Sequence, residues 1–193
     1  MNDGLFRTGR GVSLNAHDLS AGVFVRGLTN LKAELMKAEA DAAAGTDAAS
    51  LLDVRLARDA DVAGDARHDL HTYPLAAHVH WAAEGARVAI ARLLSAPAVP
   101  APADAKSFSD LYQRIDATIA GLRHVAALDI EAGLGRPLVI EHRRGSVSAD
   151  GGRFLLAFAI PHFFYHVTAA HTILRSQGVQ LTMGDFLGNW EAT

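Results

Sequence analysis

The stretch FLLAFAIPHFFYHVTAAHTILRSQG, residues 154–178, decides the fold because it is the longest apolar run of the chain. Its length and pattern predict a core helix that ends at Gly178, a residue type common directly after a helix. Pro161 lies inside the run, so we expect the helix to kink or to start afresh at that point. The run ends in polar residues and is too short for a membrane-spanning helix.

Two histidines stand inside this apolar run. Successive residues of an α-helix turn by about 100°, so His162 and His166 lie one above the other on one face. We expect both imidazoles to point into the protein, because the same face carries the apolar side chains of Leu155, Phe158, Ala169 and Ile173. Hydrogen-bonded core histidines are one interpretation of the pair, and metal ligands are the other. Two histidines four residues apart can hold one metal ion, but a tight site needs a third ligand from elsewhere in the chain.

Three other segments show the three- and four-residue apolar spacing of amphipathic helices. They cover residues 18–44, residues 74–94, and a segment that runs from a cap at Ser107 or Ser109 to about Ala126. Pro74 favours a helix start because its backbone angle suits the first turn. The predicted buried stripes are Phe24, Leu28, Leu31, Leu35 and Ala38 in the first segment; Leu75, Val79, Ala82, Ala86, Ile90 and Leu93 in the second; and Phe108, Leu111, Ile115, Ile119, Leu122 and Ala126 in the third.

The helix predicted over 74–94 supplies the candidate for the third ligand. His78 lies about 60° from the middle of its apolar face and can look inward, whereas His80 lies about 140° away and is expected at the surface. His124, off the stripe of the third helix, is also expected to be exposed. His78, His162 and His166 are therefore the candidate metal ligands. Because the chain contains no Cys, any metal is left to His and carboxylates, and imidazole-rich sites suit Zn, Ni, Cu or Fe.

The connections complete a mostly α fold. Residues 46–73 are expected to form a long connection with a short helical stretch, and the Pro/Ala-rich residues 95–104 a linker. Alternating residues from Leu138 onward, with turn signals before Phe154, predict a small β-hairpin between the third and fourth helices. The tail is expected to be irregular, with Phe186 and Leu187 packed on the bundle. The economical architecture is a four-helix bundle in a single domain, residues 15–193, after a partly disordered segment, residues 1–14.

Length and charge restrict the function. A chain of 193 residues with a formal charge of −3 and a pI near 6.3 has no broad cationic character, so neither nucleic acid nor a membrane is expected as a partner. The first residues lack the apolar core of a signal peptide. We therefore expect a cytoplasmic protein.

Several stretches resemble an uncharacterised bacterial branch, a domain of unknown function, of the DinB/YfiT-like superfamily. They are VFVRGLTNLKAEL (residues 23–35), LLDVRLARD (51–59) and PHFFYHVTAAHTILRSQGVQLTMGDFLG (161–188), and the resemblance covers about residues 18–188. It implies a four-helix bundle whose metal-binding members use one His from the second helix and an H-x-x-x-H pair from the fourth. Those positions fall on His78, His162 and His166. The branch commonly has Gln at the first position and Asn at the second, whereas this chain has His at both.

The resemblance implies an enzyme that uses a divalent metal ion (Zn, Ni or Fe) to act on a small molecule. Some superfamily members are transferases or isomerases that depend on a low-molecular-weight thiol, and a hydrolase is also compatible with such a site. Tyr165, Trp81 and Asp69 are conceivable pocket groups, and residues 58–73, with His68 and His71, look longer than in the relatives. The alternative is a metal-free module that binds a small ligand or a partner and forms a homodimer through exposed helix faces.

Overall fold

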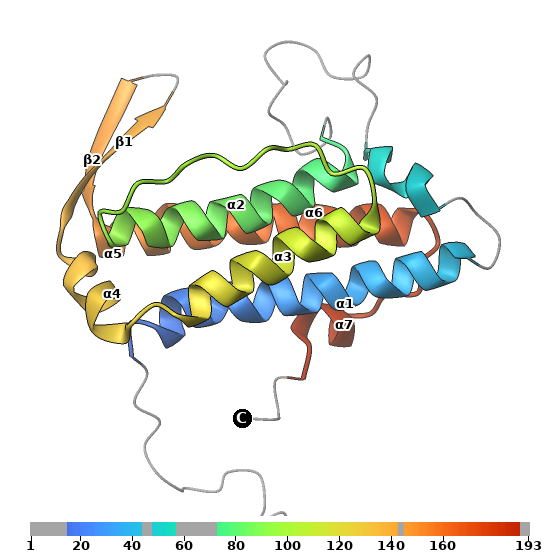
Figure 1. Cartoon of the computed structure of the whole chain (residues 1–193), viewed down its shortest axis with the longest axis horizontal. Coiled ribbons are helices and arrows are strands. Elements are labelled where there is room, and N and C mark those ends of the chain that lie inside the picture. Colours follow the sequence, from blue (N-terminus) through green and yellow to red (C-terminus); the bar gives the residue numbers. More distant parts are fainter. Residues whose placement is uncertain (1–14, 44–47, 57–72, 143–144, 190–193) are drawn as a thin grey trace, which may run out of the picture.

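Four long helices form the body of the molecule (Figure 1). The computed structural model describes residues 15–43, 48–56, 73–142 and 145–189. The long helices are α1 (Val23–Ala43), α2 (Leu75–Leu93), α3 (Phe108–Arg123) and α6 (Ile160–Ser176). A π-helical turn, Asp18–Gly22, leads into α1, and a 3₁₀ helix, Ala48–Asp53, confirms the short helical stretch expected before α2. The predicted four-helix bundle is confirmed. The predictions on residues 1–14 and on most of 58–73 lie outside the described residues.

The helices are arranged in a ring in which α1 and α2 each pack against both α3 and α6. Helices α2 and α3 run in the same direction, because the linker from residue 95 to 106 passes back along α2 before α3 begins (Figure 1). Twelve extended residues reach about 37 Å, more than the length of about 28 Å of α2. The linker therefore covers a side of α2 that faces away from the bundle core.

The apolar stripes meet in one core. Every stripe residue predicted for α1 and α2 is buried, and so are five of the six predicted for α3. Ala126 is the exception: it is exposed, because α3 ends at Arg123 and the chain turns there into α4 (Ala127–Leu134). Ser107 caps α3 as expected, since its hydroxyl accepts a hydrogen bond from the backbone N–H of Asp110. His124 is exposed, as predicted.

A change of helix type precedes α6. Residues Leu155–Ala159 form a π-helical stretch, after which α6 begins with Pro161 in its first turn. Because Pro161 has no N–H to donate to the carbonyl four residues back, the wider i→i+5 pattern accommodates it. The backbone stays helical through Ala159 and Ile160, so the kink or fresh start expected at Pro161 takes the form of a change of helix type. The π-helical stretch also shifts the angular position of the residues before Pro161, and Phe158, predicted to be buried with the two histidines, is 49% exposed.

Short elements lie at one end of the bundle and beside α1 (Figure 1). Strands β1 (Pro137–His142) and β2 (Gly145–Asp150) pair antiparallel, which confirms the predicted hairpin, and α5 (Gly151–Phe154) follows directly. The tail is not irregular, because Thr182 and Asp185 form a capping box that starts α7 (Met183–Leu187). Phe186 packs against the core as expected, whereas Leu187 is 39% exposed and does not.

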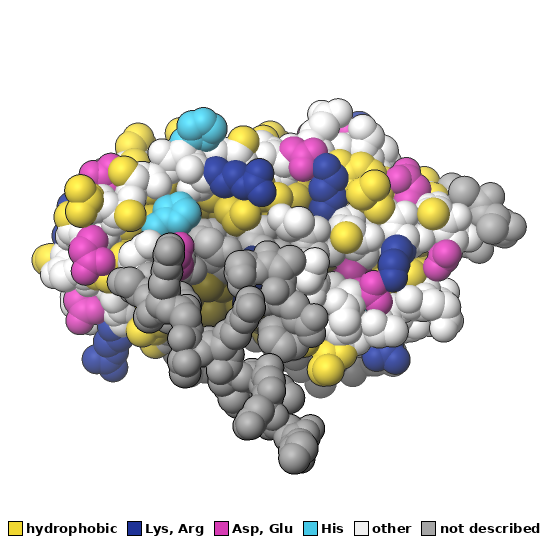
Figure 2. All heavy atoms as spheres, turned by 90° about the horizontal axis from the view of Figure 1, so that it is seen from below, with side chains coloured by type: hydrophobic (Ala, Val, Ile, Leu, Met, Phe, Trp, Pro, Cys, Tyr) yellow, Lys and Arg dark blue, Asp and Glu magenta, His cyan; other side chains and the backbone are white. Residues whose placement is uncertain are grey.

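Two surface properties follow from these helices. None of the described helices is both long and apolar enough to cross a membrane. On the face seen in Figure 2, acidic and basic side chains are interspersed, without a broad region of one charge.

Candidate functional site

Two of the predicted site residues meet in the interior between α2 and α6. His78, on the first turn of α2, is fully buried, and His166, near the middle of α6, is 4% exposed. Their Nδ1 atoms are 3.0 Å apart, a hydrogen-bonding distance. The inward orientation predicted for both residues is confirmed.

His162 lies one turn before His166 on α6 and is partly buried. Its ring centroid is 4.8 Å from that of His166, and the ring of Phe158 stacks on it at 5.5 Å with an interplanar angle of 14°. Gly85 of α2 lies opposite, and a Cβ atom there would stand 3.2 Å from Nδ1 of His162. The absence of a side chain at Gly85 thus leaves room for the imidazole between the two helices.

A cavity opens beside the histidines. Its volume is about 560 Å³, within the range of small-molecule sites, and His162 and His166 form part of its wall. The rest of the wall is apolar or aromatic: Tyr73, Trp81, Ala157, Phe158, Pro161 and Tyr165. Phe158 is exposed because it faces this cavity and not the core. Trp81 and Tyr165, which the sequence suggested as pocket groups, both lie in the wall, whereas Asp69, His68 and His71 lie outside the described residues.

Burial determines the charge of these imidazoles. It lowers the pKa of His166 to about 3, helped by the neighbouring His162, His78 and His80, and it also lowers the pKa of His162. Both rings are therefore neutral at physiological pH. A neutral imidazole keeps one nitrogen with a free lone pair, which can bind a metal ion or accept a proton.

The donor set can be compared with the needs of a divalent metal ion. Neutral imidazoles are the form in which His binds Zn, Ni or Fe. Two nitrogens at 2.0–2.1 Å from one ion are about 3.0–3.4 Å apart, so the separation of the His78 and His166 Nδ1 atoms fits a pair of ligands as well as a hydrogen bond. However, within the described ranges, no group of three or more His, Asp or Glu side chains is arranged to hold a metal ion. The imidazoles of all three histidines suit a metal ion chemically, and the separation of the His78 and His166 nitrogens also suits one geometrically.

His80 departs from the prediction. It is 3% exposed, not at the surface, and burial lowers its pKa. The prediction was wrong because it assumed that the side of α2 outside the apolar stripe faces solvent. The linker and Arg114 of α3 cover that side instead. The length of the linker could have indicated this burial. Antiparallel neighbouring helices are usually joined by shorter connections, so a long linker suggests that it runs back along α2.

Comparisons with known proteins agree with this fold. A family model described as "Domain of unknown function (DUF1993)" matches residues 16–187. The crystal structure of a DinB family member protein from Shewanella denitrificans is similar, with a TM-score of 0.77 and 29% sequence identity over 92% of this chain and 94% of that chain. No curated protein matches the chain. The predicted resemblance to a DinB-like domain of unknown function is thereby confirmed.

Proposed function

The chain belongs to the DUF1993 family of domains of unknown function, and we propose that it binds a divalent metal ion through His78, His162 and His166 and acts on a small molecule. The observation that carries this proposal is the convergence of three histidines between α2 and α6, two of which, His162 and His166, have lowered pKa values and line one cavity. Neutral imidazoles are the form in which His binds a divalent metal ion.

Each part of the site has a role in this proposal. His78 and His166 are held by two packed helices, so their nitrogens are fixed before a metal arrives. His162 stands nearer the cavity and is the ligand beside the bound substrate. A metal ion here would lower the pKa of a bound water or thiol, or polarise a substrate group. The aromatic wall, with Trp81, Phe158 and Tyr165, would exclude water and hold a small, partly apolar molecule. Thiol-dependent transfer or isomerisation, or hydrolysis, is the reaction class that fits.

Metal analysis of protein purified without a His tag tests the proposal. We expect about one equivalent of Zn, Ni or Fe per chain, and loss of most of it in His162→Ala. His162 is the preferred position because it is only partly buried, so that its loss leaves the core intact. His124→Ala, which removes an exposed histidine at the end of α3, is the matched control and should retain the metal. Protein that contains no metal, and that is not stabilised by added Zn, Ni or Fe, would rule the proposal out.

One observation favours a second candidate, a metal-free module that binds a small ligand in the same cavity. The two buried Nδ1 atoms already satisfy each other by a hydrogen bond, and no three-ligand group is formed among the described residues. In that case, small molecules found by thermal-shift screening should stabilise the protein equally with and without a chelator. The metal-dependent function instead requires that the chelator abolish the stabilisation.

A further inference from the structure

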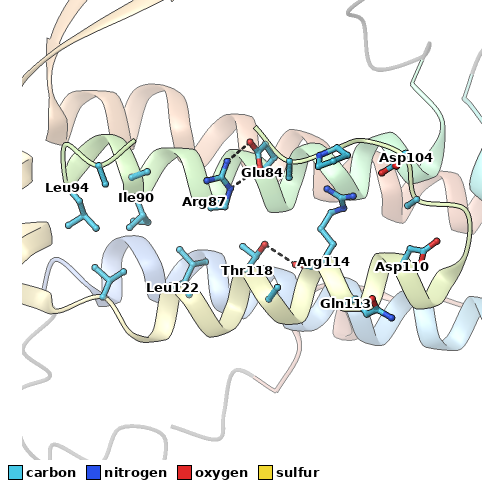
Figure 3. Close-up of a pocket in the computed structure, with 18 of the residues that line it drawn as sticks. Glu84, Arg87, Ile90, Leu94, Asp104, Asp110, Gln113, Arg114, Thr118 and Leu122 are labelled. Carbon is cyan, nitrogen blue, oxygen red and sulfur yellow. Dashed lines mark hydrogen bonds and ion pairs between the residues drawn. The ribbon is translucent and has the colours of Figure 1, made fainter. Parts of the chain in front are cut away.

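A second, larger cavity lies on another side of α2, away from the histidine cluster (Figure 3). Its volume is about 860 Å³, and its walls come from α2, from α3 and from the linker that passes back along α2. The parallel course of α2 and α3 creates this space, because the linker must cross over the groove between them. The volume suits a small organic molecule.

The two ends of this cavity differ in polarity. Leu94, Ile90 and Leu122 lie at one end, and this end is apolar. The other end carries Asp104, Asp110, Gln113 and Arg114, and the middle of the cavity carries Glu84, Arg87 and Thr118. A ligand that matched both ends would have an apolar tail and a polar head.

The other charged groups at this cavity are either hydrogen-bonded or exposed to solvent. Arg87 bonds both carboxylate oxygens of Glu84 at 2.6 and 3.0 Å, and it also donates to the carbonyl of Val99 in the linker. Asp110 accepts a hydrogen bond from the backbone N–H of Lys106 at 2.8 Å. Asp104 and Lys106 are exposed, so solvent screens their charges. The hydrogen bonds of Arg87 and Asp110 hold the linker against α2 and α3. Arg114 remains as the charged group whose partner is not yet accounted for.

Arg114 has a neutral partner only. Its guanidinium donates a hydrogen bond to Nδ1 of the buried His80 at 2.8 Å, and since a guanidinium can only donate, that nitrogen carries no proton and the ring is neutral. Its Nε atom is buried and has no hydrogen-bond partner, and across the described part of the chain no carboxylate forms an ion pair with it. In Figure 3, its side chain extends from α3 toward α2 at the polar end of the cavity. The guanidinium is partly buried and has no anionic partner among the described residues, which is unfavourable, and a bound anion would relieve this.

We propose that this cavity binds a small carboxylic acid with an apolar tail, whose carboxylate meets the Arg114 guanidinium and whose tail lies among Ile90, Leu94 and Leu122. Planar guanidinium and carboxylate groups match in geometry and can form two parallel hydrogen bonds. Arg114 and Leu122 are separated by about 12 Å along α3, a distance that a linear chain of about eight to ten carbons can span. The proposal is independent of the metal site, because it uses another side of α2.

Octanoate, octanol and octylamine are the probes that test this proposal, by titration calorimetry in the presence of a chelator. We expect octanoate to bind, and octanol and octylamine to bind at least about tenfold more weakly, because only the carboxylate meets Arg114. Arg114→Gln should weaken octanoate binding by about tenfold or more. Arg123→Gln, which removes an exposed arginine at the end of the same helix and outside the cavity, is the matched control and should leave it unchanged.

A second pair of variants separates this cavity from the histidine site. Gly121 lines the cavity, and a Cβ atom added there meets nothing within 4 Å, so Gly121→Phe should fold and place its ring in the space of the tail. We expect this variant to lose octanoate binding, and His162→Ala to retain it. Absence of octanoate binding, equal binding of the three probes, or binding that survives both Arg114→Gln and Gly121→Phe would overturn the proposal.

Discussion

At the scale of the residue, α2 carries two histidines that differ in partner more than in burial. His78 contacts another imidazole across the α2–α6 interface, whereas His80 accepts a hydrogen bond from a guanidinium on the α3 side. Both rings are buried, so the polar group that each one meets determines what it can do. His78 belongs to the group of candidate metal ligands with His162 and His166, whereas His80 orients Arg114.

The residues show where sequence reasoning succeeds. His78 and His166 could be predicted to point inward because each follows the apolar spacing of its own helix. Phe158 could not, because the π-helical stretch before Pro161 changes the angle between residues, and no periodic pattern reveals that stretch in advance. The period of α2 could not predict the burial of His80 either, since that burial depends on Arg114 of α3 and on the course of the linker in space.

An ion pair between Lys37 and Asp185 gives a prediction at the residue scale. The hydrogen bond from Lys37, together with the one from the Thr182 backbone, lowers the pKa of Asp185 from 3.8 to about 2. A lowered folded-state pKa stabilises the fold fully above pH 3.8, and this contribution is lost as the pH falls toward 2. Asp185→Asn should therefore reduce the free energy of unfolding by about 0.2–1 kcal/mol near pH 6 and by nearly nothing at about pH 2.

Urea unfolding of both proteins across this pH range measures the difference. Asn keeps a side-chain oxygen for the Thr182 backbone N–H, so the capping interaction is largely retained in the variant. Asp116→Asn, which removes the ion pair of Lys32 with α3, is a control that should leave the hydrogen-exchange protection of α7 unchanged. A difference between wild type and Asp185→Asn that stayed constant down to pH 2 would contradict the assigned cause.

At the scale of the element, the long helices could be predicted and the short ones could not. The stripes of α1, α2 and α3 each repeat over four or more turns, which gives a clear period. Helices α4 and α7 have eight and five residues, too few for a period, and α7 is recognisable only by its capping box. The candidate site lies on long helices, and for this reason its residues could be proposed from the sequence.

Helix α4 depends on a close approach to the end of α2, which gives a prediction at this scale. A Cβ atom on Gly133 would stand 2.3 Å from the backbone carbonyl oxygen of Leu93. Gly133→Ala must therefore push α4 away from α2, and we expect it to lower the free energy of unfolding by about 1–3 kcal/mol. Chemical denaturation measures this change.

Gly135 offers a matched control two residues further on. A Cβ atom there meets nothing within 4 Å, and its φ of −84° suits any residue. Gly135→Ala should leave stability unchanged or raise it by up to about 1 kcal/mol, because Ala restricts the unfolded chain. Equal effects of the two substitutions would show that α4 does not rest on α2 as described.

At the scale of the whole molecule, the linker makes two different cavities possible around one helix. Helix α2 packs against α6 on one side, where the histidines and the aromatic cavity lie, and against α3 on another, where the linker encloses the larger cavity. The sequence indicated a bundle and a Pro/Ala linker, but not that α2 and α3 run parallel, because direction depends on the course of the linker in space. The bundle thus contains the histidine site between α2 and α6 and the larger cavity with Arg114, and the two can be tested independently.

The central claim is that His78, His162 and His166 bind a divalent metal ion. Anomalous scattering from crystals of the untagged protein, collected on both sides of the Zn, Ni and Fe absorption edges, tests this claim most directly, because it reports the presence, identity and position of a metal together. We predict one strong anomalous peak between α2 and α6 within about 2.0–2.3 Å of imidazole nitrogens of these residues. A map without a peak at that position, from crystals grown with added metal, would contradict the claim.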